Sequence, residues 1–290
     1  MASQKIQLAI QRHFHKARTL GQTVAETWGE EDIHQFRVEV KKLRAYLRLA
    51  GATHTGLTAR LPGKLHVFYS MTGIVRCLQL QRKGLEDAVA RLKKELPDIC
   101  SAALESRIDT GIAVIKEYLR LNSPFGKARA EWHAPIHTQE AGKAVETFIR
   151  DRKDRIVTGA VLPDEEELHT IRKAMKDILY LWSCFSDGDV LSILPERWRS
   201  RDNLRSYTDQ LGEFHDICIQ LQLLQDAHFL LSANDKAGVL LEDVRQLWRR
   251  DKEEKLEQLR SLLMPAAEVG NENPFAPRNL NAESYELHVD

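Results

Sequence analysis

The side chains with the clearest chemical potential form a dense basic segment, HQFRVEVKKLRAYLR, at residues 34–48. Its candidate anion ligands are His34, Arg37, Lys41, Lys42, Arg44 and Arg48. Arginine offers forked donors to phosphate oxygens, and lysine supplies a compact positive charge. Like charges three or four residues apart repel one another on a helix, and a bound polyanion would relieve that repulsion. The segment is therefore a candidate polyanion site.

On a helix these cations, Lys42 excepted, lie on one side. At about 100° per residue they fall within an arc of roughly 80°, while the apolar residues between Phe36 and Ala50 form a face roughly 100–150° away. Glu39 is the nearby acid, and it points away from the cationic face. His34 falls in the first turn, where free backbone N–H groups favour an anion and a bound phosphate would favour the protonated ring. We expect a cationic stripe about 20 Å long, kept apart from the core.

The same spacing recurs in the second half of the chain, in HTIRKAMKDILYLW at residues 169–182. Here the candidate ligands are His169, Arg172, Lys173 and Lys176. The histidine, the arginine and the last lysine stand at the same separations as their counterparts in the first segment. A charged helical face is usually only solvated, but this partial repetition favours a binding site with ligands from both halves.

A second pair of matching segments follows in each half. GIVRCLQL at residues 73–80 aligns with GEFHDICI at residues 212–219, so that Arg76 and His215 occupy equivalent positions and join the candidate ligands. For His215, a local hydrogen bond to Asp216 is an equally good explanation. Repeated segments in the same order predict a duplicated helical unit with pseudo-two-fold symmetry. The basic faces of the two halves could then converge on one shared surface.

The chain shows apolar residues at helical spacings of three and four, and alternating strand-like runs are nearly absent. We therefore predict an all-α protein. The expected helices cover residues 3–28, 32–50, 57–81, 83–121, 138–157, 164–186, 195–230 and 236–263. Pro62 and Pro97 are expected to kink or split the helices that contain them.

A segment with two prolines and a glycine, LNSPFGKARAEWHAPIHT at residues 121–138, marks a joint between two halves. We expect a first four-helix bundle at about residues 3–122 and a second at about residues 138–263. Together these bundles form one domain at residues 1–265. The sequence that follows lacks helical periodicity, so residues 266–290 are expected to form a tail.

The overall composition restricts the kind of partner. The 290-residue chain has 42 basic residues (Lys and Arg) and 42 acidic ones, so it lacks the excess charge of a non-specific nucleic-acid coat protein. No segment approaches about 18 uncharged apolar residues, and the N-terminus lacks the apolar core of a signal peptide. The cysteines, which form no CxxC pair and are expected to be buried and reduced, are Cys77, Cys100, Cys184 and Cys218. We expect a cytoplasmic protein that does not enter membranes.

Sequence signals for catalysis or metal binding are weak. His13 and His15 are two residues apart and splay across a helix, and Pro135 argues against a helical pairing of His133 with His137. The sequence has no Walker loop, no GxSxG motif and no HExxH motif. Paired carboxylates for acid–base chemistry are indistinguishable from surface acids. We expect no catalytic residue, no metal site and no cofactor.

Taken together, these residues resemble the CHAD family, the conserved histidine α-helical domain. Each half of that family carries an H-x-x-R-x-x-x-K-(K/R)-x-R helix followed by an L-G-x-x-(R/H)-D-like segment. The matching positions of the first half are His34, Arg37, Lys41, Lys42, Arg44, Gly73 and Arg76. Those of the second half are His169, Arg172, Lys176, Leu211, Gly212, His215 and Asp216. The resemblance spans roughly residues 5–263.

The chain departs from the family pattern at three positions. Asp177 and Leu179 stand where the pattern has a second basic residue and an arginine. Cys77 replaces the aspartate of the later segment in the first half. We therefore expect the second half to contribute less to binding than the first.

The resemblance implies two helical bundles related by pseudo-two-fold symmetry, enclosing a basic central channel that binds inorganic polyphosphate without catalysis. Some members carry a triphosphatase domain with an ExExK motif. That motif is absent here, so the chain looks like a standalone binder. Members are also associated with polyphosphate granules.

Two alternatives stay open. One is a generic polyanion or nucleic-acid binder. Neutral net charge and few stacking aromatics near the stripes do not favour nucleic acid as the physiological partner. The other is a metal-dependent phosphohydrolase, which needs carboxylates and a metal ion converging on the channel.

Overall fold

The computed structural model describes residues 2–52, 60–126, 141–161, 163–184, 191–226 and 235–264. Throughout these ranges the secondary structure is helical and contains no strand, which confirms the prediction of an all-α protein. The helices of the first half are α1 (Ala2–Thr27), α2 (Glu30–Ala52), α3 (Gly63–Arg91) and α4 (Asp98–Leu121). Those of the second half are α5 (Ala141–Gly159), α6 (Glu165–Tyr180), α7 (Arg201–Asp226) and α9 (Asp235–Leu263). Short 3₁₀ turns between α6 and α7 lie at Trp182–Cys184, Leu191–Ile193 and Glu196–Trp198.

The two prolines start helices rather than kinking them, and Pro97 lies in the break between α3 and α4 that splits the helix expected at residues 83–121. Pro62 precedes α3 with a φ of −53°, and Pro97 precedes α4 with a φ of −60°. The fixed φ of proline suits the beginning of a helix. α3 runs without interruption through residues 81–83, so the break predicted there is wrong. The chain leaves the helix after Arg91 instead, and Lys93 adopts the left-handed conformation, with a φ of 54°, that often ends a helix.

Some sequence-based expectations lie outside the described residues. They include most of the joint at residues 121–138, the tail at residues 266–290, and the pair His133 and His137. The domain limits at residues 1 and 265 therefore stay a prediction.

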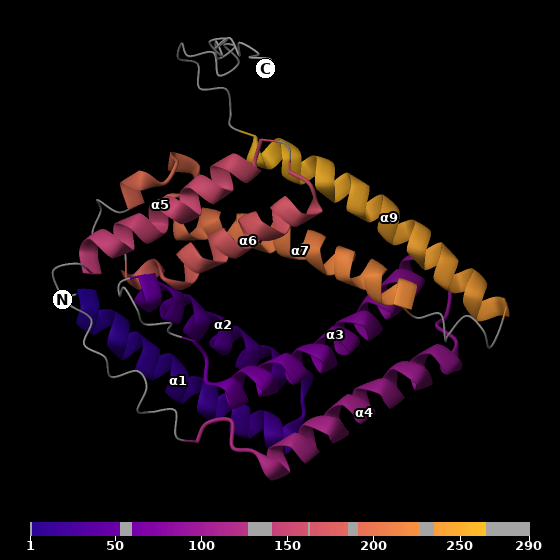
Figure 1. Ribbon diagram of the computed structural model, residues 1–290. Coiled ribbons are helices and arrows are strands. Elements are labelled where there is room, and N and C mark those ends of the chain that lie inside the picture. Colours follow the sequence, from indigo (N-terminus) through magenta and orange to yellow (C-terminus); the bar gives the residue numbers. More distant parts are fainter. Residues whose placement is uncertain are drawn as a thin grey trace, which may run out of the picture.

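The helices are arranged as antiparallel pairs that together form a ring (Figure 1). α1 packs on α2 and α3 on α4 in the first half, while α5 packs on α6 and α7 on α9 in the second. Each half is a V made of two such pairs, with α2 and α3 on the inner side of one V and α6 and α7 on the inner side of the other. The repeated order of pairs is compatible with the expected pseudo-two-fold relation.

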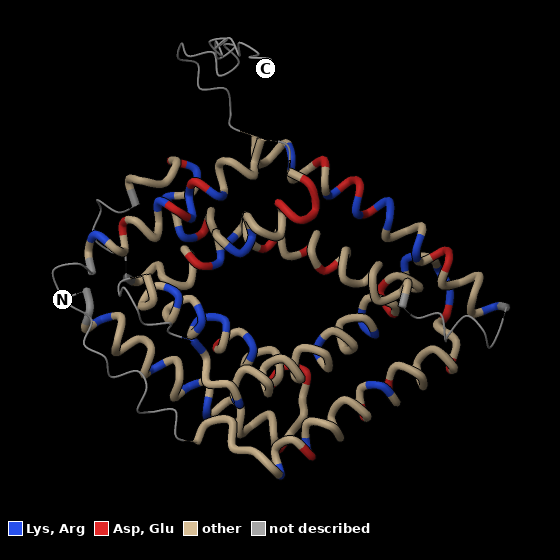
Figure 2. The backbone as a smooth tube through the Cα atoms, in the orientation of Figure 1, with Lys and Arg blue, Asp and Glu red and all other residues tan. Residues whose placement is uncertain are grey.

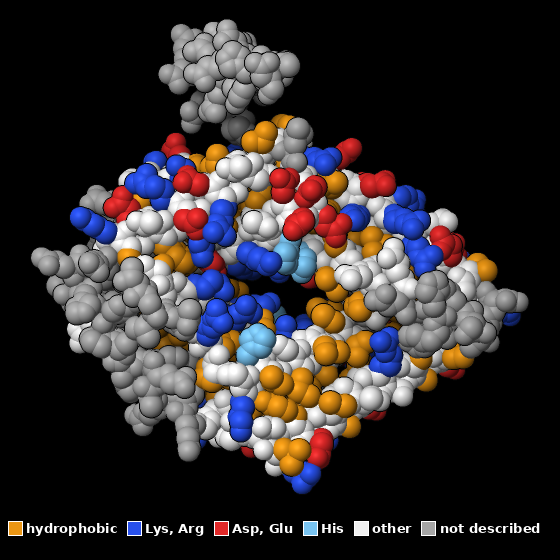
Figure 3. Space-filling view, viewed as in Figure 1, with side chains coloured by type: hydrophobic (Ala, Val, Ile, Leu, Met, Phe, Trp, Pro, Cys, Tyr) orange, Lys and Arg blue, Asp and Glu red, His pale blue; other side chains and the backbone are white. Residues whose placement is uncertain are grey.

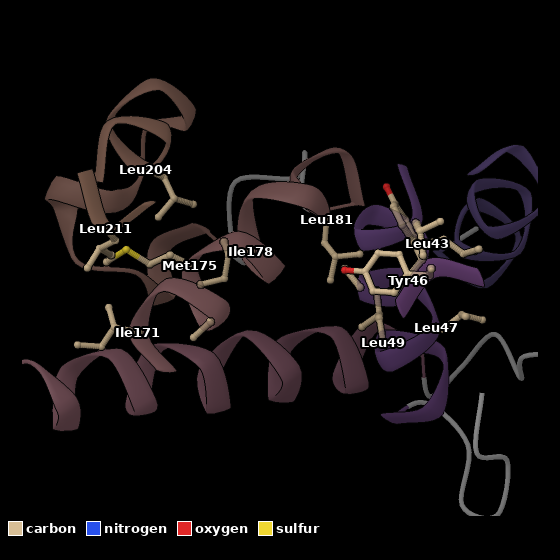
Figure 4. Packing of buried hydrophobic residues seen from close by; sticks show 14 of the residues in the cluster. Leu43, Tyr46, Leu47, Leu49, Ile171, Met175, Ile178, Leu181, Leu204 and Leu211 are labelled. Atoms are coloured by element: carbon tan, nitrogen blue, oxygen red, sulfur yellow. The ribbon is translucent and has the colours of Figure 1, made fainter. Parts of the chain in front are cut away.

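A large hydrophobic cluster joins the halves at one end of the ring. It takes buried residues from α1, α2, α3 and α4 and continues into α5, α6 and α7 and the C-terminal end of α9. Leu181, which follows α6, faces Tyr46 and Leu49 of α2 (Figure 4). The hydroxyl oxygens of Tyr46 and Ser183 lie 3.1 Å apart across the same contact. Burying this apolar surface holds α2 beside α6, the two helices that carry the repeated basic motif.

A smaller hydrophobic cluster closes the ring at the opposite end. It combines buried residues of α3, α4, α7 and α9, among them Leu85, Leu224 and Val244. α3 approaches α7 closely here because Gly84 has no Cβ, and the side chain of Gln220 occupies the space that a Cβ would need. Hydrophobic packing is thus concentrated at two separate places, which leaves the inner wall between them free for polar side chains.

Two further observations concern thiols and membranes. Cys100 and Cys218 are buried, Cys77 is half-buried, and all three are free thiols. The side chain of Cys184 lies outside the described residues. Among the helices that the structure describes, none has the length and apolar character needed to cross a membrane.

Replacing Leu85 with alanine should weaken the smaller closure. Leu85 is fully buried, so Leu85→Ala should lower the free energy of unfolding by about 2–5 kcal/mol. Urea denaturation followed by circular dichroism measures the change. The matched control is Leu8→Ala, because Leu8 on α1 is 58% exposed. A loss for Leu85→Ala no larger than that for the control would contradict the described closure.

Candidate functional site: a basic cavity between the two halves

A cavity of about 560 Å³, called the basic cavity below, lies between the inner helices of the two halves. Its cations come from α2, α5 and α6. Figure 2 shows Lys and Arg along the inner helices, and Figure 3 shows their side chains gathered beside the central opening of this face. Cations brought together at this density in a concave site attract a polyanion.

Most of the ligands predicted from the sequence line this cavity. They are Arg37, Lys41, Arg44 and Arg48 of the first half and His169, Arg172, Lys173, Lys176 and His215 of the second. His34 and Arg76 are outside this lining but lie close by, since the charges of Arg76, Lys41 and Arg37 all act on His34. The two repeated motifs therefore meet in space although they are far apart in the sequence.

Arg37 is held against α3 by contacts with Tyr69 and Gly73. These contacts explain why a glycine begins the second repeated segment, GIVRCLQL. Arg37 Nη1 donates to the Tyr69 carbonyl oxygen at 2.6 Å, and its guanidinium carbon lies 4.5 Å from the centre of the Tyr69 ring. Gly73 makes room for it, since a Cβ there would lie 2.7 Å from Arg37 Nη1. In the second half a Cβ on Gly212 would lie 3.7 Å from Arg172 Nε. The repeated arginine and the repeated glycine are thus neighbours in both halves.

Lys41 lies where the charges of the two halves meet. Burial, and then the charges of Arg37, Arg172 and Lys176, lower the pKa of Lys41 to about 8. Asp216 of α7 acts in the opposite direction. Burial also lowers the pKa of Arg37 and that of Lys176. An anion among these side chains would stabilise their charged forms, so a bound polyanion and a proton on Lys41 favour each other.

The histidines of this region are held in their neutral form at pH 7. The rings of His169 and His215 stack, with 4.5 Å between centroids and 24° between planes. Burial, and then the charge of Arg172, lowers the pKa of His215 to about 4. Burial and neighbouring cations also lower the pKa of His169 and that of His34. These rings can take up protons when an anion offsets the surrounding charge.

Two buried polar atoms on α6 have no hydrogen-bond partner among the described residues, His169 Nδ1 and Arg172 Nε. An unpaired buried polar group costs about 1–3 kcal/mol. Arg172 Nε always carries a hydrogen, so it can donate to an anion in the cavity. Burial raises the pKa of Tyr180, which also lines the cavity, to about 12, so its hydroxyl stays a donor as well.

Lys42, which the sequence predicts as a ligand, pairs with Glu39 instead. It is absent from the lining of the basic cavity, and its Nζ lies 3.5 Å from Glu39 Oε2. Glu39 is 2% exposed, and its other partners are Lys16, at 3.8 Å, and His13, at 2.6 Å. A buried carboxylate requires compensation by charge and hydrogen bonds. Lys42 and His13 therefore stabilise Glu39 between α1 and α2.

The cations of α5, Arg152 and Arg155, line the cavity and were missed by sequence reasoning. They belong to RDRKDR, residues 150–155, whose mixed charges are typical of a solvated helix face. Arg152 is nevertheless 13% exposed, and its guanidinium carbon lies 3.9 Å from the centre of the Phe148 ring. The charge pattern along α5 gives no signal that separates the largely buried Arg152 from its exposed neighbours, to which Arg155 belongs.

Asp177, one of the departures from the family pattern, ties the two halves together. Its carboxylate accepts hydrogen bonds from Arg48 Nε at 3.1 Å and from Arg48 Nη2. It also accepts one from Arg152 Nε at 3.2 Å. Arg48 belongs to the first half and Arg152 to the second, so one buried carboxylate pairs with a cation from each. This pairing reduces the positive charge that both arginines offer to an anion.

The fold has a counterpart among solved structures. The chain is similar to the crystal structure of the CHAD domain from the plant Ricinus communis, with a TM-score of 0.63 and 16% sequence identity, over 91% of each chain. At that identity the likeness shows a common fold. No match was found among curated proteins.

The family follows from the sequence itself. The family model of the CHAD domain matches residues 8–225, a range that contains both basic motifs and both glycine segments. The chain therefore belongs to the CHAD domain family. This membership confirms the resemblance carried by the repeated motifs.

The titration of His215 tests the buried, cationic character of the cavity. Its pKa should lie near 4, well below the ordinary value of about 6.5, because burial and the charge of Arg172 disfavour its protonated form. Nuclear magnetic resonance of labelled histidine side chains measures this value, and the variant His215→Asn identifies the signal. A pKa of His215 near 6.5 would be incompatible with its place beside Arg172.

Proposed function

We propose that the basic cavity is a channel that binds inorganic polyphosphate without hydrolysing it. The observation that supports this most directly is the meeting of Arg37, Arg172 and Lys176 around Lys41. These cations come from two helices far apart in the sequence. An extended anion in their midst would stabilise all of them at once, because Coulomb attraction is strong where water is partly excluded.

The dimensions favour a chain of phosphates over a single phosphate. The cations of α2 extend from Arg37 to Arg48, about 16 Å along the helix axis. Polyphosphate carries negative charge along its whole length, so a chain lying between α2 and α6 meets many cations together. By analogy with other polyanions, the release of its counterions should contribute much of the affinity.

The aromatic side chains favour polyphosphate over nucleic acid. Single-stranded nucleic acids bind by stacking their bases on accessible aromatic rings. Tyr69 is 8% exposed, and the guanidinium carbons of Arg37 and Arg44 lie 4.5 and 5.6 Å from its ring centre. That ring therefore offers no platform for a base. RNA at equal charge concentration should displace bound polyphosphate poorly, whereas efficient displacement would indicate a generic polyanion site.

The phosphohydrolase alternative requires ligands for a metal ion. Within the described parts of the chain, no group of three or more His, Cys, Asp or Glu residues is placed to hold one. This observation favours binding over hydrolysis. Release of phosphate from polyphosphate in the presence of Mg²⁺ would speak against the proposal.

Removing two cations from α2 should abolish most of the affinity. Arg37→Ala combined with Lys41→Ala should weaken binding of long-chain polyphosphate by at least about 100-fold, at about 1.5–3 kcal/mol for each hydrogen bond to a charged group. Calorimetric titration measures this, and circular dichroism reports whether the helices persist. The control, Lys5→Ala with Arg12→Ala, removes equal charge from exposed positions of α1 and should have less than about a threefold effect. Equal losses of polyphosphate affinity in the two double variants would contradict the proposal.

The same titration ranks the two halves. The substitutions at Asp177 and Leu179 predict a weaker second half, but Arg172 lines the cavity with a buried Nε that has no hydrogen-bond partner in the described part of the chain. Arg37 is already engaged by Tyr69. We therefore revise the ranking and expect Arg172→Ala to weaken binding at least as much as Arg37→Ala.

Replacing Asp177 with asparagine should act in opposite directions on stability and binding. The change takes a buried carboxylate from Arg152, which is 13% exposed, and should lower the free energy of unfolding by about 1–3 kcal/mol. It also frees Arg48 for phosphate and leaves Arg152 with Asp151 as its remaining carboxylate partner, so polyphosphate affinity should rise several-fold. Urea denaturation and a binding titration of one preparation measure both effects. Unchanged stability together with unchanged affinity would show that this ion pair has neither role.

A further inference from the structure

We propose that Lys41 is a site of covalent acylation by acyl phosphates, the mixed anhydrides of a carboxylic acid and phosphoric acid. This reaction rests on the proposed function, because the cations that would hold polyphosphate must also hold the phosphoryl group of the reagent. It adds a chemical modification at one side chain of the basic cavity.

Lys41 has the surroundings of a nucleophilic amine. The charged and titratable groups around it are His34 and Arg37 of α2, Cys77 of α3, Arg172 and Lys176 of α6, and His215 and Asp216 of α7. Its cationic neighbours and its burial both disfavour the ammonium form. In the free protein, where its pKa is about 8, roughly one quarter of Lys41 is free amine at pH 7.5. A lysine with the ordinary pKa of about 10.4 is almost entirely protonated at that pH. A bound phosphoryl group offsets the neighbouring cations but not the burial, which is the largest cause of the low pKa of Lys41.

The other lysines near this region lack that combination. Lys176 and Lys42 each lie within ion-pair distance of a carboxylate, at 3.6 and 3.5 Å. Lys173 is exposed to solvent. Lys41 is therefore the amine of the cavity with the strongest reason to react.

An acyl phosphate carries both a group that the cavity can hold and a carbon that an amine can attack. Arg172, whose buried Nε has no partner among the described residues, can donate to a phosphoryl oxygen. A phosphoryl group held there keeps the adjoining carbonyl carbon beside Lys41. The acyl transfer then takes place within one complex and no longer depends on a bimolecular encounter. The same cations stabilise the phosphate as it departs.

The reaction is an acyl transfer that needs no oxidant or reductant. The Lys41 amine attacks the carbonyl carbon, a C–N bond forms, and the C–O bond to phosphate breaks. Phosphate leaves with the bonding electron pair and takes up the proton that the amine loses. The products are an amide at Lys41 and hydrogen phosphate.

Acylation would reduce the affinity of the cavity for polyanions. An amide at Lys41 is uncharged and larger than the ammonium group it replaces, and it stands where the charges of both halves meet. Polyphosphate affinity should fall by about tenfold or more, the loss expected for a hydrogen bond to a charged group. Bound polyphosphate should in turn cover Lys41 and protect it from the reagent.

Acetyl phosphate is a suitable probe. The full chain is incubated with it at pH 7.5, and acetylation at each lysine is followed over time by peptide mass spectrometry. Lys41 should react at least about tenfold faster than the exposed Lys5 and Lys83, because its reagent is held in place. Long-chain polyphosphate should suppress this excess, and Arg172→Gln should remove it. An acetic ester of N-hydroxysuccinimide, which has no phosphate, should show a smaller preference for Lys41.

Acetylation of Lys41 no faster than that of Lys5 and Lys83 would overturn the assignment. That comparison uses the unaltered chain, so it does not depend on the folding of a variant. A preference that survives both Arg172→Gln and added polyphosphate would also overturn it. The two proposals fail separately. Polyphosphate binding without preferential acetylation removes the modification site alone, whereas preferential acetylation without polyphosphate binding removes the proposed function alone.

Discussion

Mutual repulsion among the cations of the basic cavity is the constraint to which the rest of the structure responds. Arg37, Arg172 and Lys176 act on a partly buried Lys41 strongly enough that its pKa falls to about 8. Each of these charges would be better solvated in water, so the cavity opposes its own assembly. Two hydrophobic clusters, one at each end of the ring, hold the inner helices in place against that repulsion. The site is therefore destabilised in a way that a polyanion could reverse.

Acids are placed to neutralise the cations that have structural tasks. Buried Glu39 pairs with Lys42 on the side of α2 that faces α1. Buried Asp177 pairs with Arg48 and Arg152 and links the two halves. The zero net charge of the chain thus conceals a separation: among the described residues, the cavity is lined by many arginines and lysines and by one acid, Asp177, while the other acids lie elsewhere. That separation explains how a neutral protein can present a strongly basic site.

The sequence was sufficient to predict the features that depend on the spacing of residues along a single helix. Apolar spacing predicted the helices, and the repeated motifs predicted that Arg37 and Arg172 serve equivalent positions, which the nearby Gly73 and Gly212 support. It was insufficient where the decisive neighbour lies on another helix. A helical wheel places Lys42 outside the stripe but does not show that its partner Glu39 is buried against His13 and Lys16 of α1. In the same way, a mixed charge run hides the burial of Arg152. For the same reason the sequence shows Asp177 only as the loss of a basic residue from the family pattern, whereas in the structure it forms an ion pair between the halves.

The salt dependence of polyphosphate affinity tests most directly whether both halves hold one chain. In the unaltered protein, the logarithm of affinity should fall with the logarithm of salt concentration with a slope of magnitude about 4 or more, as expected for about six phosphate contacts. Removing Arg37 and Lys41, or alternatively Arg172 and Lys176, should reduce that magnitude by about 1.4 in each case. An unchanged slope after loss of the pair on α6 would contradict the account, because the first half would then hold the chain by itself.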